Sequence, residues 1–520
     1  MTLTVMDWFC GAGGSSQGID AVPGVEVTLA ANHWQLAIDS HASNFPRVRH
    51  ERGDIRDLPV HRWPVATGFW ASPECKKWTG ARGKKRDYAA ADTPLPGLPG
   101  LQPTPPEEDE RSRALMWDVP KYLEGVQRRG KLVLFGVVEN VVEARTGRDW
   151  DRWLRDFHHL GYKTRLIAFN SMHAQHTRTP RSPQSRDRLY LAYWHTSLGR
   201  DPDFDKWLRP QAYCPGCDRD VYALQVFKTP GRDMGRYRQQ YVYRCPHTTC
   251  RNRVVEPAVL PAAAAIDWSL PGQRIGDRAK PLAEKTIRRI EAGLKKFARP
   301  LVLSADGTWR NDAVPVAGPL PTRTTRKNDG LAWMPYMVEL RGGSSDARSI
   351  HEALATVTAS GNHHGLVAPP AAMVMRNNGS TGDGGEHCTS AADPLRTLTT
   401  AGHQSLVTWE HLLVPYYGNG TARTVREPVG ALSTRDRYAL IQGDVDIDDV
   451  LFRMLEPHEI GRAMAFAESY VVLGSKRERV CQYGNAVTPP VAELLTSALA
   501  ETVTGEDLDR HPDQTWSIAA

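Results

Sequence analysis

An apolar run followed at once by a glycine-rich turn opens the chain. LTVMDWF (residues 3–9) leads into CGAGGSS (residues 10–16), and GIDAV comes next. An apolar strand, a tight glycine turn and the start of a helix form a nucleotide-binding βα unit, in which glycines let backbone N–H groups approach a ligand. The G-x-G-G spacing differs from the dinucleotide fingerprint and from the P-loop. The opening therefore predicts an α/β sheet with a ligand site at its first turn.

Further segments predict the other strands of the sheet. They are VEVTLAANHW (25–34), RVRHERGDI (47–55), VATGFWASPEC (65–75), KLVLFGVVENV (131–141), KTRLIAFNS (163–171) and DRLYLAYW (187–194). In open α/β sheets, ligands bind outside the carboxyl ends of the strands. The glycine loop, Asp54, Cys75 and Glu139 all lie at such ends. We expect these four segments to converge on one crevice.

Cys75 is followed by six Lys and Arg side chains within residues 76–86. Nearby positive charge lowers the pKa of a thiol and makes it more reactive. The same charge attracts the phosphates of a nucleic acid. The alternative interpretation of this stretch alone is a solvated surface loop with an inert cysteine.

Four of the eight cysteines form two closely spaced pairs, Cys214-Pro-Gly-Cys217 and Cys245-Pro-His-Thr-Thr-Cys250. The segments between the pairs, YALQVF (222–227) and RQQYVYR (238–244), can form a short hairpin. This pattern predicts a zinc ribbon, with His247 as an alternative ligand. Four thiolates leave no open coordination position, so we expect a structural metal.

Composition narrows the class of protein. The 520 residues carry a formal net charge of +6 with a pI near 8.8, which suits a polyanionic partner. No window reaches the roughly 18 uninterrupted apolar residues of a membrane span. The N-terminus lacks the charged region and cleavage site of a signal peptide. We therefore expect a cytoplasmic protein without membrane contact, in which structural disulfides do not form.

Six motifs occur in one order: FCGAGGSSQG (9–18), GDI (53–55), SPEC (72–75), ENV (139–141), QSRDRLYL (184–191) and QYGNAVTPPVAELL (482–495). In order and spacing, including the long gap before the last motif, the chain resembles the DNA cytosine-5 methyltransferases. The resemblance covers roughly residues 1–200 and 450–500. It implies a doubly wound, Rossmann-like α/β domain that uses S-adenosylmethionine to methylate carbon 5 of cytosine.

The resemblance also implies catalytic roles. The thiolate of Cys75 would add to carbon 6 of a flipped-out cytosine, and Glu139 would protonate ring nitrogen 3. Asn140, Arg186 and Arg188 would hold the base and its neighbouring groups.

For the cofactor, the resemblance implies one set of binding residues along the carboxyl edge of the sheet. They are Phe9, Gly11, Gly13, Gly14, His33, Trp34, Asp54, Asn485 and Val487. Two positions depart from the family pattern. His33 stands where an acidic residue usually holds the ribose, and Glu74 separates the usual proline from the catalytic cysteine.

The region between the fifth and sixth motifs contains an internal repeat. The units are GPLPTRTTRKNDGLAW (318–333), EALATVTASGNHHGLV (352–367), DPLRTLTTAGHQSLV (393–407) and EPVGALSTRDRYALI (427–441). Alternating threonines and glycine-rich turns predict strands joined by hairpins or loops. The repeats are interpreted either as readers of DNA or as a plain β scaffold. Since the resembled family keeps its target-recognition domain here, we favour DNA recognition.

We therefore predict five parts. They are a catalytic domain (1–200), a zinc-ribbon insertion (201–260), a β-rich target-recognition region (261–449), the C-terminal part of the catalytic domain (450–502) and a flexible tail (503–520). The expected partner is double-stranded DNA, bound by a monomer, with a restriction endonuclease partner left open. Two alternatives remain: an RNA cytosine-5 methyltransferase, and a catalytically inactive zinc-ribbon protein that binds DNA.

Overall fold

The computed structural model describes residues 2–73, 107–147, 149–260 and 455–512, together with short strands and turns between 262 and 454. Cys75, Glu74 and the basic run after them lie outside the described residues. The chain divides into two compact units. The first comprises Met1–Ile266, Pro394–Gly402 and Glu456–Ala520, and the second comprises Asp267–Asp393 and His403–Leu455. Within the described ranges, no helix has both the length and the apolar character needed to cross a membrane.

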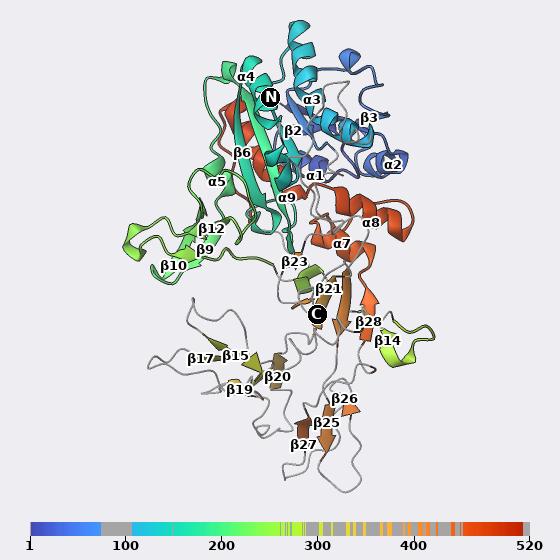
Figure 1. Cartoon of the computed structure of the whole chain (residues 1–520), viewed down its shortest axis with the longest axis vertical. Helices are drawn as coiled ribbons and strands as arrows, with labels where there is room; N and C mark the ends of the chain where they lie inside the picture. The colour runs from blue at the N-terminus through green and yellow to red at the C-terminus, as the bar shows by residue number, and fades with distance from the viewer. Residues whose placement is uncertain are drawn as a thin grey trace, which may run out of the picture. The chain divides into compact units, whose positions relative to one another are not determined.

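A seven-stranded sheet forms the centre of the first unit, in the order β3-β2-β1-β4-β5-β8-β6. Its strands are β1 (Leu3–Trp8), β2 (Val25–Asn32), β3 (Arg49–Arg52), β4 (Gly68–Ala71), β5 (Phe135–Asn140), β6 (Tyr162–Asn170) and β8 (Asp187–His195). Strands β1 to β5 pair in parallel, whereas β8 runs antiparallel to both of its neighbours. The predicted Rossmann-like arrangement, a mixed α/β fold with a mostly parallel sheet, is confirmed (Figure 1).

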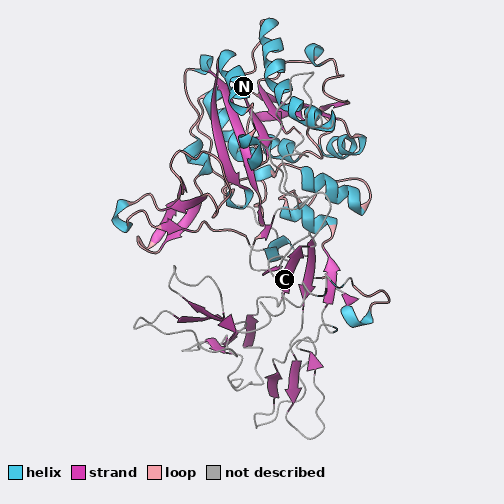
Figure 2. Ribbon diagram, in the orientation of Figure 1, coloured by secondary structure: helices cyan, strands magenta, loops and turns pink. Residues whose placement is uncertain are grey.

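Helices cover both faces of this sheet (Figure 2). The helices of the unit are α1 (Gly14–Asp20), α2 (Gln35–Asn44), α3 (Glu107–Arg128), α4 (Trp150–His159), α5 (Phe204–Leu208), α7 (Pro457–Ala463), α8 (Lys476–Asn485) and α9 (Pro489–Thr504). Alternate residues of a strand face opposite sides of a sheet. Accordingly, Leu3 and Val5 of β1 join a core with α1, α5 and α9, while Met6 and Trp8 join a core with α3 and α4.

The C-terminal helix α9 packs directly on α1, although the two are far apart in sequence. A Cβ atom added at Gly14 would lie 2.1 Å from the carbonyl oxygen of Val487. One added at Gly18 would lie 2.1 Å from the carbonyl oxygen of Pro489. The small residues of the first helix therefore permit a backbone approach that a side chain would block.

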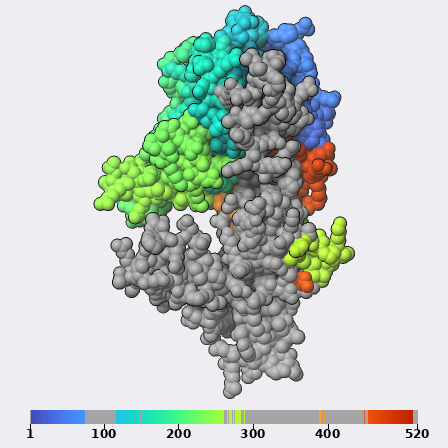
Figure 3. Space-filling model, in the orientation of Figure 1, coloured from blue at the N-terminus to red at the C-terminus, as the bar shows by residue number. Residues whose placement is uncertain are grey.

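The two cysteine pairs lie within a segment of five short strands in the same unit. These are β9 (Gln211–Cys214), β10 (Arg219–Tyr222), β11 (Leu224–Phe227), β12 (Tyr241–Arg244) and β13 (Val254–Val255). Strand β11 pairs antiparallel with β12, as the sequence predicts, and β9 pairs antiparallel with β10. Figure 3 shows the green surface of this segment continuous with the blue-green surface of the sheet region.

Among its described strands, the second unit contains three three-stranded sheets and one five-stranded sheet, and all four share one pairing pattern. In each, a central strand pairs antiparallel with the next strand along the chain and with a later one. The central strands are β15 (Leu301–Ser304), β18 (Tyr336–Glu339), β21 (Ala372–Arg376) and β25 (Leu412–Pro415). Their partners are β16 (Val314–Pro315) and β17 (Asp329–Ala332), β19 (Ala347–Ser349) and β20 (His364–Val367), β22 (Cys388–Ser390) and β24 (Gln404–Thr408), and β26 (Arg423–Thr424) and β27 (Tyr438–Ile441).

The end of each sequence repeat supplies the later strand of one such sheet. The threonine-rich stretches, from which the sequence predicts strands, lie largely outside the described residues. The third sheet is extended through β24 by β28 (Leu451–Met454) and β14 (Gln273–Arg274). Between β22 and β24, the strand β23 (Leu395–Arg396) belongs to the first unit, where it pairs in parallel with β7 (Gln184–Ser185).

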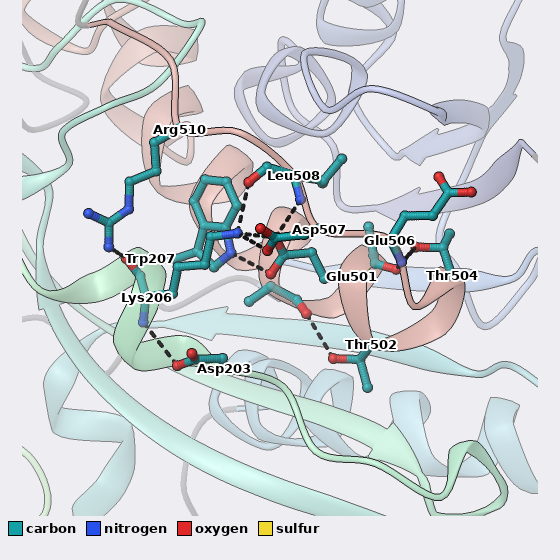
Figure 4. Close-up of polar contacts among 12 residues, drawn as sticks. Asp203, Lys206, Trp207, Glu501, Thr502, Thr504, Glu506, Asp507, Leu508 and Arg510 are labelled. Carbon is teal, nitrogen blue, oxygen red and sulfur yellow. Dashed lines mark hydrogen bonds and ion pairs between the residues drawn. The ribbon is translucent and has the colours of Figure 1, made fainter.

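The segment after α9 is held against α5 (Figure 4). Lys206 forms ion pairs with Glu501 and Asp507, each at 2.5 Å, and the backbone N–H of Leu508 donates to Glu501 at 2.8 Å. The guanidinium of Arg510 also lies over the ring of Tyr222, 4.4 Å from its centroid. Asp507, Leu508 and Arg510, which make these contacts, fall in the segment that the sequence predicts to be a flexible tail, residues 503–520.

Candidate active site

Glu139 is the buried carboxyl group at the carboxyl end of β5. Only 9% of the residue is exposed. Its Oε1 atom lies 3.1 Å from Nε of Arg188, which begins the neighbouring strand β8. Burial raises the pKa of Glu139, and the nearby guanidinium groups of Arg188 and Arg186 oppose that rise. A carboxyl group whose proton is retained to higher pH is suited to act as an acid.

Asn140 lies beside the chain segment that leads to Cys75. Its side-chain amide donates to the carbonyl oxygen of Pro73 at 3.4 Å, and its own oxygen accepts from the backbone N–H of Val141 at 2.8 Å. Ser72 is fixed in turn, because its backbone N–H donates to the carbonyl oxygen of Trp8. The end of β4 is therefore anchored next to Glu139 just before the sequence reaches Cys75.

Arg186 binds the C-terminal motif. Its buried guanidinium donates to the carbonyl oxygens of Gly484 and Ala486, at distances between 3.0 and 3.3 Å. Its backbone N–H donates to Asn170 at 3.0 Å. This arginine therefore joins the QSRDR and GNAV segments, while Arg188 is the arginine that pairs with Glu139.

The glycine loop has the backbone geometry that the sequence predicts for a ligand-binding turn. Phe9, Gly11 and Gly13 all have positive φ, at 60°, 53° and 99°. Among the described residues, no atom lies within 4 Å of a Cβ placed at Gly11, whereas one at Gly13 would lie 2.3 Å from the hydroxyl of Tyr470. Gly13 is therefore needed for packing against Tyr470, and the described residues leave Gly11 uncovered.

A buried polar chain under this loop was not predicted from the sequence. Asp7 of β1 accepts hydrogen bonds from the hydroxyls of Ser15 and Ser16, at 2.6 and 2.7 Å. The hydroxyl of Ser16 lies 2.9 Å from Nε2 of His41, whose Nδ1 lies 2.8 Å from Nε2 of His50. Burial raises the pKa of Asp7 to about 7 and lowers that of His41 to about 3. The available signal was one carboxylate inside the otherwise apolar run LTVMDWF.

The other expected cofactor residues lie at the carboxyl ends of β2 and β3 and at the end of α8. Trp34 is half-buried and is the N-cap residue of α2. Its backbone N–H donates to the side-chain oxygen of Asn32 at 2.9 Å. His33 is exposed beside it. Asp54 follows β3 and accepts from the backbone N–H of Arg56 at 3.2 Å.

From the C-terminal motif, Asn485 is exposed at the end of α8, and its amide lies 3.8 Å from Sγ of Cys481. Val487 is buried against Gly14. The carboxyl edge of the sheet thus carries every expected cofactor residue that precedes the last motif, and α9 brings that motif to the glycine loop.

Cys214, Cys217, Cys245 and Cys250 form one cluster, in which all four sulfur atoms lie within 4.8 Å of one another. The Sγ atoms of Cys214 and Cys250 are 3.8 Å apart, as are those of Cys217 and Cys245. A tetrahedral zinc with bonds of about 2.3 Å requires sulfur separations of about 3.8 Å, so the donor set fits this metal.

Two neighbours of the cluster bear on its ligand set. Gly216 permits the fit, because a Cβ there would lie 2.9 Å from Cβ of Cys250. Nε2 of His247 lies 2.9 Å from the guanidinium of Arg219, and this histidine is not in the cluster. The four cysteines, rather than the histidine, are therefore the ligand set that the geometry offers.

Residues 3–206 match the family model described as C-5 cytosine-specific DNA methylase. The match supports a C-5 cytosine methyltransferase for the part of the chain that holds the sheet, Glu139 and the arginines. It also supports the use of S-adenosylmethionine and binding of a nucleic acid, as the family implies. No match is found among the curated proteins.

Several solved structures resemble the whole chain at low identity. The methyltransferase EhMeth of Entamoeba histolytica is 9% identical, with a TM-score of 0.43, covering 97% of this chain and 99% of that one. A DNMT2 mutant of Spodoptera frugiperda is 13% identical, with a TM-score of 0.44 and coverage of 96% and 100%. A putative DNA modification methyltransferase from an Escherichia coli prophage is 14% identical, with a TM-score of 0.41 and coverage of 97% and 100%.

Proposed function

We propose that this chain transfers a methyl group from S-adenosylmethionine to carbon 5 of cytosine in double-stranded DNA. The observation that carries the proposal is the buried Glu139, paired with Arg188 at 3.1 Å and adjacent to the anchored strand end before Cys75. The family match over residues 3–206 supports the reaction. The large repeat-bearing region supports DNA over RNA as the substrate.

The reaction begins on a cytosine flipped out of the duplex. The Cys75 thiolate forms a bond to carbon 6, and the electron pair displaced from the ring moves toward nitrogen 3, where Glu139 delivers its proton. Carbon 5 thereby becomes nucleophilic. Arg188 holds Glu139 and the base in register, and Asn140 fixes the strand end that carries the thiol.

When bound, S-adenosylmethionine would supply an electrophilic methyl group, and its sulfonium sulfur would be left as a neutral thioether. Carbon 5 forms its bond to this methyl as the carbon–sulfur bond breaks. Loss of the proton from carbon 5 to water then expels the Cys75 thiolate, nitrogen 3 returns its proton to Glu139, and the aromatic ring is restored. We assign cofactor binding to the glycine loop at Gly11, with Phe9, Trp34, Asp54 and the GNAV segment around it.

We further propose one structural zinc ion on the four clustered cysteines. The 3.8 Å sulfur separations support this metal. The ion would take no part in the chemistry, because four thiolates complete its coordination.

Bisulfite sequencing of DNA from a methylation-free bacterial host that expresses the chain tests the function. We expect methylated cytosines at one recurring sequence, and none in cells expressing Cys75→Ser at the same level. Methylated transfer RNA beside unmethylated DNA would instead identify an RNA methyltransferase. Absence of methylation in both, with DNA binding retained, would identify an inactive DNA-binding protein.

A further inference from the structure

The cysteine-bearing strands share a hydrophobic core with the catalytic sheet. Tyr241 and Tyr243 of β12 are fully buried, and Tyr237 is 8% exposed. The rings of Tyr237 and Tyr243 lie edge-on to that of His173, with centroids 4.4 and 4.9 Å away. Phe227, at the end of β11, packs on the ring of Tyr241. Residues 211–257 are thus built onto the face of the sheet that carries α3 and α4.

The loop between β11 and β12 contacts the segment that carries both arginines. The backbone N–H of Tyr237 donates to Oδ1 of Asp187 at 3.0 Å. The hydroxyl of Tyr241 lies 3.5 Å from the same oxygen. Asp187 stands between Arg186 and Arg188 at the start of β8. A hydrogen bond to its carboxylate therefore fixes the backbone from which Arg188 reaches Glu139.

The same loop contacts the segment that follows Glu139 and Asn140. This segment is the short helix η3 (Val142–Thr146). Asp233 accepts from Nε of Arg145 at 3.0 Å, and Arg236 forms an ion pair with Glu143. One loop therefore binds the chain on both sides of the Glu139–Arg188 pair.

The cysteine cluster determines how firmly this loop is held. Cys245 directly follows β12, the strand with Tyr241 and Tyr243, and a bound metal would tie it to the β9–β10 turn. Metal ligation supplies folding energy to a segment too small to form its own core. An ordered β12 then holds the loop in place through the packed tyrosines. The loop in turn holds Asp187 and η3 through its polar contacts.

Resting on the function proposed above, we infer that the zinc-bearing segment braces the catalytic residues, with Asp187, Arg236 and Glu143 as positioning residues. The sequence instead predicts a role for this segment in recognising the target. A segment that supports the catalytic residues (a brace) and one that recognises the target sequence (a reader) differ in which property is altered when they are lost. Loss of a brace lowers kcat at unchanged target sequence, because a misplacement of about 1 Å can cost about a hundredfold in rate. Loss of a reader changes which sites are methylated.

The test uses charge reversal in the full-length protein, which avoids dependence on a variant that fails to fold. We expect Arg236→Glu to lower kcat by about tenfold or more on duplex DNA. KM for S-adenosylmethionine and the pattern of methylated sites should stay unchanged. Adding Glu143→Arg to the same protein should restore most of the rate, because the ion pair is re-formed with reversed charges. Arg232→Glu, an exposed residue of the same loop, is the matched control and should keep the wild-type kcat.

A second measurement does not depend on methylation. Zinc is removed from the wild-type protein with a chelator, and hydrogen exchange is followed by mass spectrometry. We expect faster exchange in residues 142–146 and 187–189, with the exchange of β1 and β2 unchanged. The proposal is overturned if exchange in those two segments does not respond, or if Arg236→Glu alters the methylated sequence while keeping kcat. If exchange in those segments becomes faster on zinc removal but the protein methylates nothing, the structural role of the zinc-bearing segment stands and the proposed reaction is refuted.

Discussion

At the scale of single residues, the candidate site contains two sets of ionisable groups, the Glu139–Arg188 pair and the buried Asp7 under the glycine loop. The sequence identifies Glu139 because it stands in an ENV motif at a strand end. The sequence does not show that Arg186 binds the carbonyl groups of the C-terminal motif while Arg188 binds the carboxyl group. Alternation along a strand places both arginines on one face but does not show that Arg186 binds a partner 300 residues away along the chain.

Asp7 gives a pH-dependent contribution to stability. Burial raises its pKa from 3.8 to about 7, so between these values the folded state holds a proton that the unfolded chain has lost. Its contribution to the free energy of unfolding is complete below pH 3.8 and is lost as the pH rises to about 7. Asp7→Asn stays neutral at both ends of this range. We therefore expect the variant to become more stable relative to wild type, by up to about 4 kcal/mol, between pH 4 and pH 7.5.

Urea unfolding followed by tryptophan fluorescence at the two pH values measures this difference. Asp57→Asn, at an exposed position on the same unit, is the control and should follow the wild-type pH dependence. If the stability of Asp7→Asn relative to wild type were the same at both pH values, the raised pKa of Asp7 would be refuted.

At the scale of elements, the strands were predictable and the long-range packing was not. Apolar runs and glycine turns predicted the strands of the central sheet within a few residues, because those signals are local. The contact between α1 and α9 has no local signal. From sequence Gly14 is expected to bind the cofactor, whereas a Cβ at Gly14 or Gly18 would lie 2.1 Å from the backbone of Val487 or Pro489. The short hairpin between the cysteine pairs was predictable, but not the catalytic segments that its loop contacts.

Substitution of Gly14 tests this packing. Gly14→Ala would place a methyl group 2.1 Å from the carbonyl oxygen of Val487, so either α1 or the C-terminal motif must move. We expect a loss of about 1–3 kcal/mol in the free energy of unfolding, together with weaker binding of S-adenosylmethionine. Gly125→Ala in α3 is the matched control, because a Cβ there meets nothing within 4 Å. That change should raise stability by about 0.5–1 kcal/mol. Equal stability of the two variants in thermal unfolding would contradict the account.

At the scale of the whole molecule, two kinds of architecture share one chain. The first unit is assembled from segments at both ends of the sequence, so its core depends on contacts between distant residues. The second unit repeats one three-stranded topology four times, and each copy depends on pairing within fewer than about 40 residues. The repeat was visible in the sequence as recurring Thr and Gly patterns. The sequence showed no sign that Leu395–Arg396, within the third repeat, pairs with the start of the QSRDR segment in the first unit. Under the proposed function, the first unit would carry the chemistry and the second would recognise DNA.

Trapping of the covalent complex is a direct test of the proposed bond between Cys75 and carbon 6 of cytosine. The protein is incubated with S-adenosylmethionine and a long DNA duplex in which 5-fluorocytosine replaces cytosine. Fluorine does not leave carbon 5 as a proton does, so the bond between Cys75 and carbon 6 should persist on a denaturing gel. We expect a shifted band of protein joined to DNA with the wild-type protein, a much weaker band with Glu139→Gln, and none with Cys75→Ser. A band of equal strength with Cys75→Ser, or a band with fluorocytosine-containing transfer RNA and none with the duplex, would contradict the account.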